Sequence, residues 1–178
     1  SRQQAIRTVT EAWARIPQGA PLTQGYRILL TAGSYPRAEL PNYWERRYGT
    51  QSAPILIQAA DGRGTATFLG DINAFDVRYL YLVDFTLAPL PAGDAFHCEQ
   101  CDHILLRGMD VSGGNRQAHE TIKVNQSRYL YIEDSNIHGS YENNIDFVAV
   151  QYGHIIGNRI HDADDWCAYV KGGSAQIL

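Results

Sequence analysis

The stretch RYLYLVDFTL (residues 78–87) decides the fold, because variants of it return four more times along the chain. The later copies are DHILLRGMDV (102–111), RYLYIEDSNI (128–137), YGHIIGNRI (152–160) and SAQIL (174–178). They recur at intervals of about 22 to 26 residues. Self-similarity at a nearly fixed period is typical of a repeat architecture.

A shorter strand-like segment precedes each of these later copies. The segments are AFHCEQC (95–101), TIKVNQS (121–127), FVAVQ (147–151) and CAYVKGG (167–173). No helical pattern separates the two kinds of segment, and hairpin turns such as Asn-Gly are missing between them. The sequence therefore predicts an all-β solenoid in which each strand stacks on its copy one coil later.

The first residues carry a different pattern. Ile6, Val9, Trp13 and Ile16 recur at helical spacing, which predicts an amphipathic helix over residues 2–16, and a proline then ends it. Strand-like segments follow at YRILLTAGSY (26–35), PILIQAA (54–60) and TATFLGDI (65–72). We expect one domain over residues 1–178, with residues 2–16 as a cap, coils over 26–178 and clear repeats from about residue 78.

This pattern resembles the right-handed parallel β-helix superfamily, which includes pectate lyases and polygalacturonases. The resemblance covers essentially the whole chain: GYRILLTAGSY (25–35) is similar to the first coil, and the preceding helix to the N-terminal cap of that superfamily. It implies a right-handed solenoid whose capping helix covers an open core end. Because the chain stops inside a repeat at Leu178, we also expect the native protein to continue.

Composition excludes several classes of protein. The 178 residues carry a net charge of −4, which argues against nucleic acid as a partner. No window approaches the roughly 18 apolar residues that a membrane span needs. The resemblance implies a secreted or periplasmic protein, which we expect to be a monomer; no signal peptide is recognisable in this chain.

The three cysteines do not form a complete disulfide set. Cys98 and Cys101 on an extended strand would lie about 10 Å apart, beyond disulfide reach without a tight turn. In the same segment, period-2 alternation points Cys98 inward and His97 outward, which argues against a zinc site. We expect core and turn cysteines.

Alternation also predicts which side chains face outward on the sheet formed by the shorter segments. With Cys98, Val124, Val150 and Val170 as one inward row, two outward columns follow. The first column is His97, Lys123, Ala149 and Tyr169, and the second is Glu99, Asn125, Gln151 and Lys171. Both lysines of the chain thus fall on one face, where the resemblance places an extended, uronate-containing polysaccharide.

Lyase chemistry is the leading hypothesis for this face. β-Elimination needs a base, and Lys123 or Lys171 can serve if burial or a cationic neighbour lowers its pKa. We expect His97, Glu99, Asn125, Gln151, Tyr169 and Trp166 to contact the substrate. The oxygens of Glu99, Asn125 and Gln151 also suggest a Ca²⁺ site, with Glu99 and Asn125 as its leading ligands.

Two alternatives remain open. Asp164-Asp165 and Asn144-Ile145-Asp146 resemble acidic elements of polygalacturonase-type hydrolases, which makes Asp146 and Asp165 a candidate acid–base pair. Trp166 before Cys167 and the isoleucine at 145 depart from that pattern, and turn formation also explains the aspartates. The second alternative is a non-catalytic solenoid that only binds polysaccharide or has a structural role.

Overall fold

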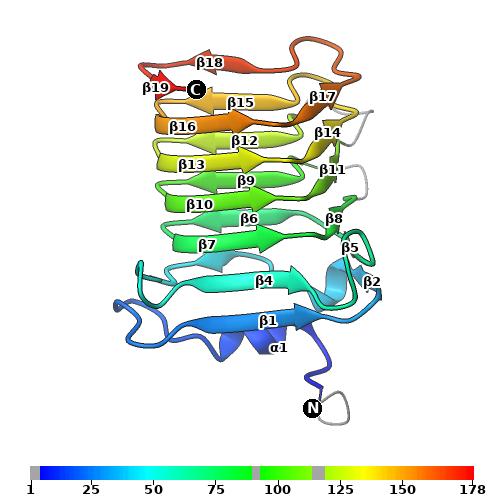
Figure 1. Cartoon of the computed structure of the whole chain (residues 1–178), viewed down its shortest axis with the longest axis vertical. Coiled ribbons are helices and arrows are strands. Elements are labelled where there is room, and N and C mark those ends of the chain that lie inside the picture. Colours follow the sequence, from blue (N-terminus) through cyan, green and yellow to red (C-terminus); the bar gives the residue numbers. More distant parts are fainter. Residues whose placement is uncertain (1–4, 90–92, 114–118) are drawn as a thin grey trace.

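The computed structural model describes residues 5–89, 93–113 and 119–178, and it is an all-β parallel solenoid (Figure 1). Within these residues the strands form three sheets of seven, six and six members, and every neighbouring pair within a sheet is parallel. Successive strands pass from sheet A to sheet B to sheet C, and the next coil then stacks on the last (Figure 1). The all-β solenoid prediction is confirmed.

Sheet A consists of β1 (Tyr26–Leu30), β4 (Ile55–Ala59), β7 (Arg78–Val83), β10 (Asp102–Arg107), β13 (Arg128–Glu133), β16 (Gln151–Ile156) and β19 (Ala175–Ile177). Sheet B consists of β2 (Gly33–Pro36), β5 (Ala66–Leu69), β8 (Thr86–Leu87), β11 (Asp110–Ser112), β14 (Asn136–His138) and β17 (Arg159–His161). Sheet C consists of β3 (Trp44–Glu45), β6 (Ile72–Phe75), β9 (Phe96–Glu99), β12 (Ile122–Asn125), β15 (Ile145–Val148) and β18 (Tyr169–Lys171).

The core lies between the three sheets and is built from stacked inward side chains. On sheet C, Cys98 pairs with Val124, and Val124 pairs with Phe147 on the next coil. All three have no exposed surface. Trp44, Phe68 and Phe85 are equally buried near the N-terminal end, where their rings pack at centroid distances of 4.8 to 6.4 Å.

The N-terminal helix is shorter than predicted. The structure forms α1 only over Val9–Ala14, because Thr8 is extended and its side chain accepts a hydrogen bond from the Glu11 amide as an N-cap. The predicted residues 2–4 lie outside the described part of the chain. Trp13 packs edge-on against Trp44 at 4.8 Å, so α1 contacts the core as a cap does.

Two strand predictions are wrong in their bounds. The single strand expected over 65–72 is divided into β5 and β6 by Gly70 and Asp71, because the chain turns there from sheet B to sheet C. The strand expected over 147–151 is β15 at Ile145–Val148. Phe147 rather than Val150 occupies the inward row, because the coil from Lys123 to Asp146 is three residues shorter than the coil from His97 to Lys123.

The corner between sheets C and A contains a disulfide where the sequence predicted unpaired core and turn cysteines, because the condition for a bond, a tight turn, is met. Cys98 and Cys101 are bonded, with their Cα atoms 6.1 Å apart. Gln100 between them adopts a φ of 55°, and this tight left-handed turn brings the two residues within disulfide range. Cys167 is free and exposed.

Candidate functional site

The outer face of sheet C carries the candidate site, in two rows of paired side chains. The first row is His97, Lys123, Asp146 and Tyr169, and the second is Glu99, Asn125, Val148 and Lys171. Asp146 therefore replaces the predicted Ala149, and Val148 replaces Gln151, because of the shorter coil. Gln151 begins β16 on sheet A, and its side-chain amide donates to the Gly173 carbonyl at 2.9 Å.

Asp146 is a fully buried carboxylate held between the two lysines. Its Oδ2 lies 2.5 Å from Lys123 Nζ and 3.0 Å from Lys171 Nζ. Burial alone would raise the pKa of Asp146, but hydrogen bonds from both lysines outweigh burial and lower this pKa. Its Oδ1 has no hydrogen-bond partner among the described residues. Asp146 therefore organises charge beneath the surface and is not itself exposed to a substrate.

Lys123 does not meet the condition for acting as a general base, which is a lowered pKa. Its ammonium group lies 2.7 Å from Glu120 Oε1 in addition to its contact with Asp146. Burial favours a lower pKa for Lys123, but the hydrogen bonds to Asp146 and Glu120 prevail and raise this pKa. The side chain thus remains an ammonium ion at neutral pH.

Asp94 is the carboxyl group suited to hold a proton. Its Oδ1 accepts a hydrogen bond from the Glu120 amide at 3.0 Å, and its side chain is 12% exposed. Burial, followed by repulsion from the Glu120 carboxylate, raises the pKa of Asp94 to about 6. A carboxyl group with this pKa is a competent proton donor in mildly acidic solution.

His97 joins Asp94 to the first row. Its Nδ1 lies 3.4 Å from Asp94 Oδ2, and its Nε2 lies 3.3 Å from the Asn125 side-chain amide. Burial lowers the pKa of His97, which favours a neutral ring at pH 7. A neutral imidazole ring beside a carboxyl group can accept a proton at a ring nitrogen. We call Asp94, His97, Glu120, Lys123, Asp146 and Lys171 the sheet C cluster.

An aromatic pair borders the cluster on its last coil. Trp166 is 62% exposed, and its ring stacks on Tyr169 at a centroid distance of 6.5 Å. Lys171 Nζ lies 4.6 Å from the Tyr169 ring centroid. The predicted contacts Trp166 and Tyr169 are therefore adjacent to the lysine that holds Asp146.

Asp165 makes no recorded contact with Asp146. It lies in the exposed connection between β17 and β18, where its backbone amide donates to the Glu142 carbonyl at 3.1 Å. Asn144, in the predicted Asn144-Ile145-Asp146 element, has a structural role. It is fully buried, its side-chain oxygen accepts a hydrogen bond from Thr121, and its side-chain nitrogen donates to the His161 carbonyl. The expected pair is thus an exposed turn residue and a buried carboxylate.

The expected calcium ligands are only partly adjacent. Glu99 and Asn125 are neighbours on β9 and β12, but the third expected oxygen donor, Gln151, lies on sheet A. Among the described residues, no group of three or more His, Cys, Asp or Glu side chains is arranged to hold a metal ion. Calcium binding by Glu99 and Asn125 stays a prediction.

Sequence reasoning missed Asp94 and Glu120. Each precedes its sheet C strand by the same two positions, ahead of Phe96 and Ile122, and these two residues are paired. A signal was present, since the two carboxylates are 26 residues apart, as are His97 and Lys123. Both residues lie one position before the predicted segments 95–101 and 121–127, so period-2 alternation within those segments does not include them.

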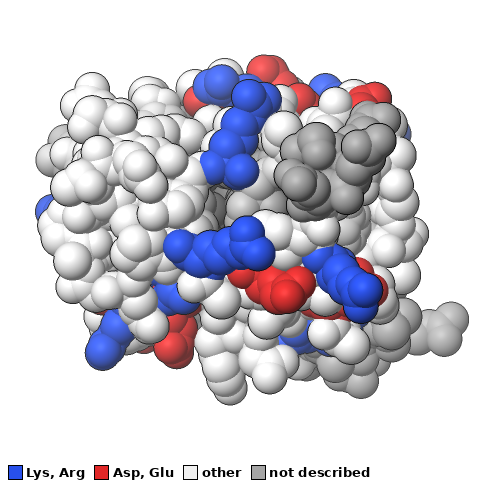
Figure 2. Space-filling model, turned by 90° about the horizontal axis from the view of Figure 1, so that it is seen from below, with Lys and Arg blue, Asp and Glu red and all other residues white. Residues whose placement is uncertain are grey.

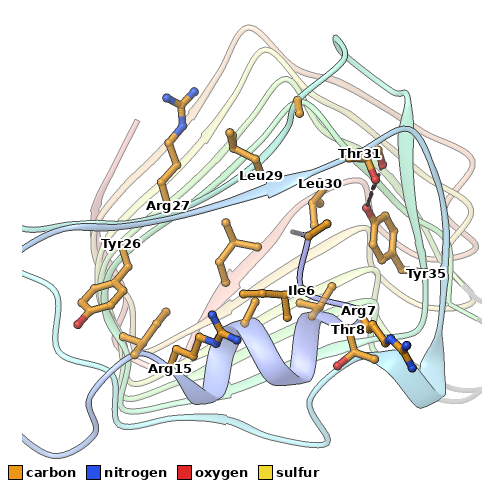
Figure 3. A pocket seen from close by; sticks show the side chains of 16 residues that line it. Ile6, Arg7, Thr8, Arg15, Tyr26, Arg27, Leu29, Leu30, Thr31 and Tyr35 are labelled. Carbon is orange, nitrogen blue, oxygen red and sulfur yellow. Dashed lines mark hydrogen bonds between the residues drawn. The ribbon is translucent and has the colours of Figure 1, made fainter. Parts of the chain in front are cut away.

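Away from sheet C, a hollow of about 540 Å³ lies at the N-terminal end between α1 and β1. Figure 2 views this end and shows basic side chains around the hollow; Arg7, Arg15 and Arg27 belong to its lining. In Figure 3 Arg27 points away from α1, and Tyr35 bonds Thr31. The described lining has no carboxylate or histidine, so this hollow lacks the proton-transfer groups of sheet C.

Comparison with known proteins yields no match: no family model, no curated protein and no solved structure corresponds to this chain. In the part of the chain that the structure describes, no helix has the length and apolar character needed to cross a membrane.

Proposed function

We propose that this solenoid acts on an extended polysaccharide and cleaves its glycosidic bonds at the sheet C cluster. The observation that carries the proposal is the protonatable Asp94, whose pKa is raised to about 6, beside the neutral His97 on an outward face. Cleavage at a glycosidic oxygen needs a proton donor for the leaving group. Asp94 supplies that proton, and the exposed Trp166–Tyr169 pair offers a platform for a sugar ring.

Hydrolysis is the chemistry that the charges favour. From β9 to β18, and among the described residues, the face has four carboxyl groups (Asp94, Glu99, Glu120 and Asp146) and two ammonium groups (Lys123 and Lys171). An excess of carboxylates disfavours a polyanionic substrate and provides both an acid and a second carboxylate for inverting or retaining hydrolysis. Glu120, whose Oε1 contacts Lys123 Nζ and whose amide donates to Asp94, is the second carboxyl group nearest to Asp94.

Elimination on a uronate is the second candidate, and one observation favours it. The neutral His97 lies on β9 directly beside Lys123 on β12. In this chemistry His97 takes the proton next to the uronate carboxylate, and the lysine ammonium offsets the charge of that carboxylate. The base is then His97 rather than Lys123.

One experiment separates these chemistries. The whole chain is incubated with neutral polysaccharides and with polyuronates, and reducing ends and ultraviolet absorbance of unsaturated products are both followed. We expect new reducing ends without absorbance, and loss of at least 100-fold in rate in Asp94→Asn. Absorbance on a polyuronate that depends on His97 would establish elimination instead.

Absence of any product from every polymer would overturn cleavage. Retained binding in that case would identify a passive polysaccharide-binding solenoid.

The secreted or periplasmic location that we propose is supported by the Cys98–Cys101 disulfide, because such bonds persist in oxidising compartments.

A further inference from the structure

The outer face of sheet A carries two parallel rows of side chains, and one of them is continuously aromatic. Tyr79, His103, Tyr129 and Tyr152 stack ring on ring with centroid distances of 4.2, 4.3 and 4.8 Å. Each of the four has a φ between 51° and 58°, and each stands one residue before the inward position of its strand. These bulged residues carry the rings onto the corner beside the sheet.

From β7 to β16 the neighbouring row is aromatic except at one position. Its members on β7, β10, β13 and β16 are Tyr81, Leu105, Tyr131 and His154, which pair in register. Tyr131 and His154 are in edge-on contact at 4.8 Å. Leu105 therefore interrupts the row of rings between Tyr81 and Tyr131 with a smaller side chain.

A cavity of about 430 Å³ is found at this interruption. Its lining is Gln51, Tyr79, Tyr81, His103, Leu105, Arg107, Tyr131 and Glu133. Tyr79 and His103 form one wall, and the Arg107–Glu133 ion pair forms the opposite one, with Nη2 2.6 Å from Oε2. We call this cavity the sheet A slot.

The slot has polar edges but no net charge. Arg107 and Glu133 neutralise each other. Burial raises the pKa values of Tyr81 and Tyr131, so both phenols stay neutral at pH 7. Ring faces with neighbouring hydroxyl, amide and ion-pair groups suit a ligand that is apolar on its faces and rich in hydroxyls at its rim.

We propose that the sheet A slot binds one pyranose ring of a neutral glycan, which inserts over Leu105 between Tyr81 and Tyr131. The hydroxyls of the sugar then bond the rim formed by Arg107, Glu133 and Gln51. Further sugar rings extend along the aromatic rows, whose members repeat at each coil. The slot lies on a different sheet from the sheet C cluster, so it is a second binding site and does not depend on cleavage there.

The test uses neutral hexasaccharides of glucose, xylose, mannose and galactose as probes of the whole chain. A hexamer of galacturonic acid tests charge, and phenol tests a purely aromatic ligand. Binding is measured by calorimetry and by shifts of tyrosine resonances. We expect a neutral hexasaccharide to bind, with affinity reduced at least tenfold in Leu105→Tyr, which fills the missing ring position.

Leu56→Tyr is the matched control, because Leu56 pairs with Tyr81 on the same row but does not line the slot. It should bind the probe as the unaltered chain does. Thermal unfolding of both variants checks that each has folded, and Tyr131→Phe, which keeps the ring, should retain most of the affinity.

Three results would overturn the proposal: no binding of any neutral hexasaccharide, binding that Leu105→Tyr leaves unchanged, or binding of phenol or the uronate hexamer alone. Asp94→Asn separates this site from the cleavage site. It should abolish bond cleavage and leave hexasaccharide binding at the slot unchanged, so that failure of one proposal is recognisable without the other.

Discussion

Asp146 is a carboxylate with no exposed surface, and its charge is tolerable only because two ammonium groups approach it. Removing one partner from a buried ion pair is more costly than the pair itself is stabilising, because it leaves a charge buried and under-compensated. Replacing Lys123, whose side chain is 20% exposed, should therefore destabilise the fold more than replacing Lys171, whose side chain is 38% exposed.

We therefore expect Lys123→Met to lower the free energy of unfolding by about 3 kcal/mol. Urea denaturation measures the change. Lys171→Met is the matched control and should cost clearly less, because water already screens Lys171. Adding Asp146→Asn to Lys123→Met should recover part of the loss; equal losses in both lysine variants would contradict the role given to Asp146.

Asp94 predicts a dependence of stability on pH. The pKa of Asp94 is about 6 in the folded chain against an ordinary value of 3.8, so the folded state binds this proton more tightly than the unfolded state. Stability then falls as the pH rises from about 4 to about 6, and the cost of the buried charge is complete above that window.

Asp94→Asn should remove this slope and raise the free energy of unfolding at pH 7.5 by about 3 kcal/mol. At about pH 2.5, where Asp94 is protonated in both states, the variant and the unaltered chain should be equally stable. Denaturant unfolding at several pH values gives the comparison, and an unchanged slope in the variant would place the raised pKa on another group.

At the scale of strands and corners, the disulfide joins β9 of sheet C to the start of sheet A on the following coil. It closes a very short loop, and the entropy it removes from the unfolded chain grows with loop length. Reduction should therefore lower the free energy of unfolding by only about 2 kcal/mol. The measurement is denaturation with and without reductant, with Cys167→Ser as a control for the free thiol.

The sequence predicted strands well where alternation and repetition agree, as for β7, β10, β13 and β16. It failed where the coil changes length, since a fixed period placed Val150 inward and Ala149 outward in place of Phe147 and Asp146. The change of length lies in the connections from sheet B to sheet C, which have nine residues at 113–121 and six at 139–144. The disulfide depends instead on the left-handed Gln100 in the corner from sheet C to sheet A. Neither loop length nor a left-handed residue leaves a periodic trace in residue type, so neither the position of Asp146 nor the disulfide was predictable.

At the scale of the molecule, each coil contacts only its neighbours, so opening can begin at an end and proceed inward. Val170 on β18 is 42% exposed, whereas its inward partners on earlier coils have no exposed surface. Amide hydrogen exchange should therefore be slowest in β7, β10 and β13 and faster in β18 and β19. Uniform protection across all coils would indicate a single cooperative unit instead.

The corners differ in how freely their length varies along the solenoid. From β7 onward, two residues connect sheet A to sheet B in each coil, for example Gly108 and Met109, whereas the connections from sheet B to sheet C span residues 88–95, 113–121, 139–144 and 162–168. Asp94 and Glu120 lie at the ends of the first two of these. Differences in coil length thus fall at the border of the sheet C cluster while the ladders keep their alignment. A lineage of such proteins can alter what that cluster accepts by lengthening or shortening one connection per coil, without rebuilding the interior.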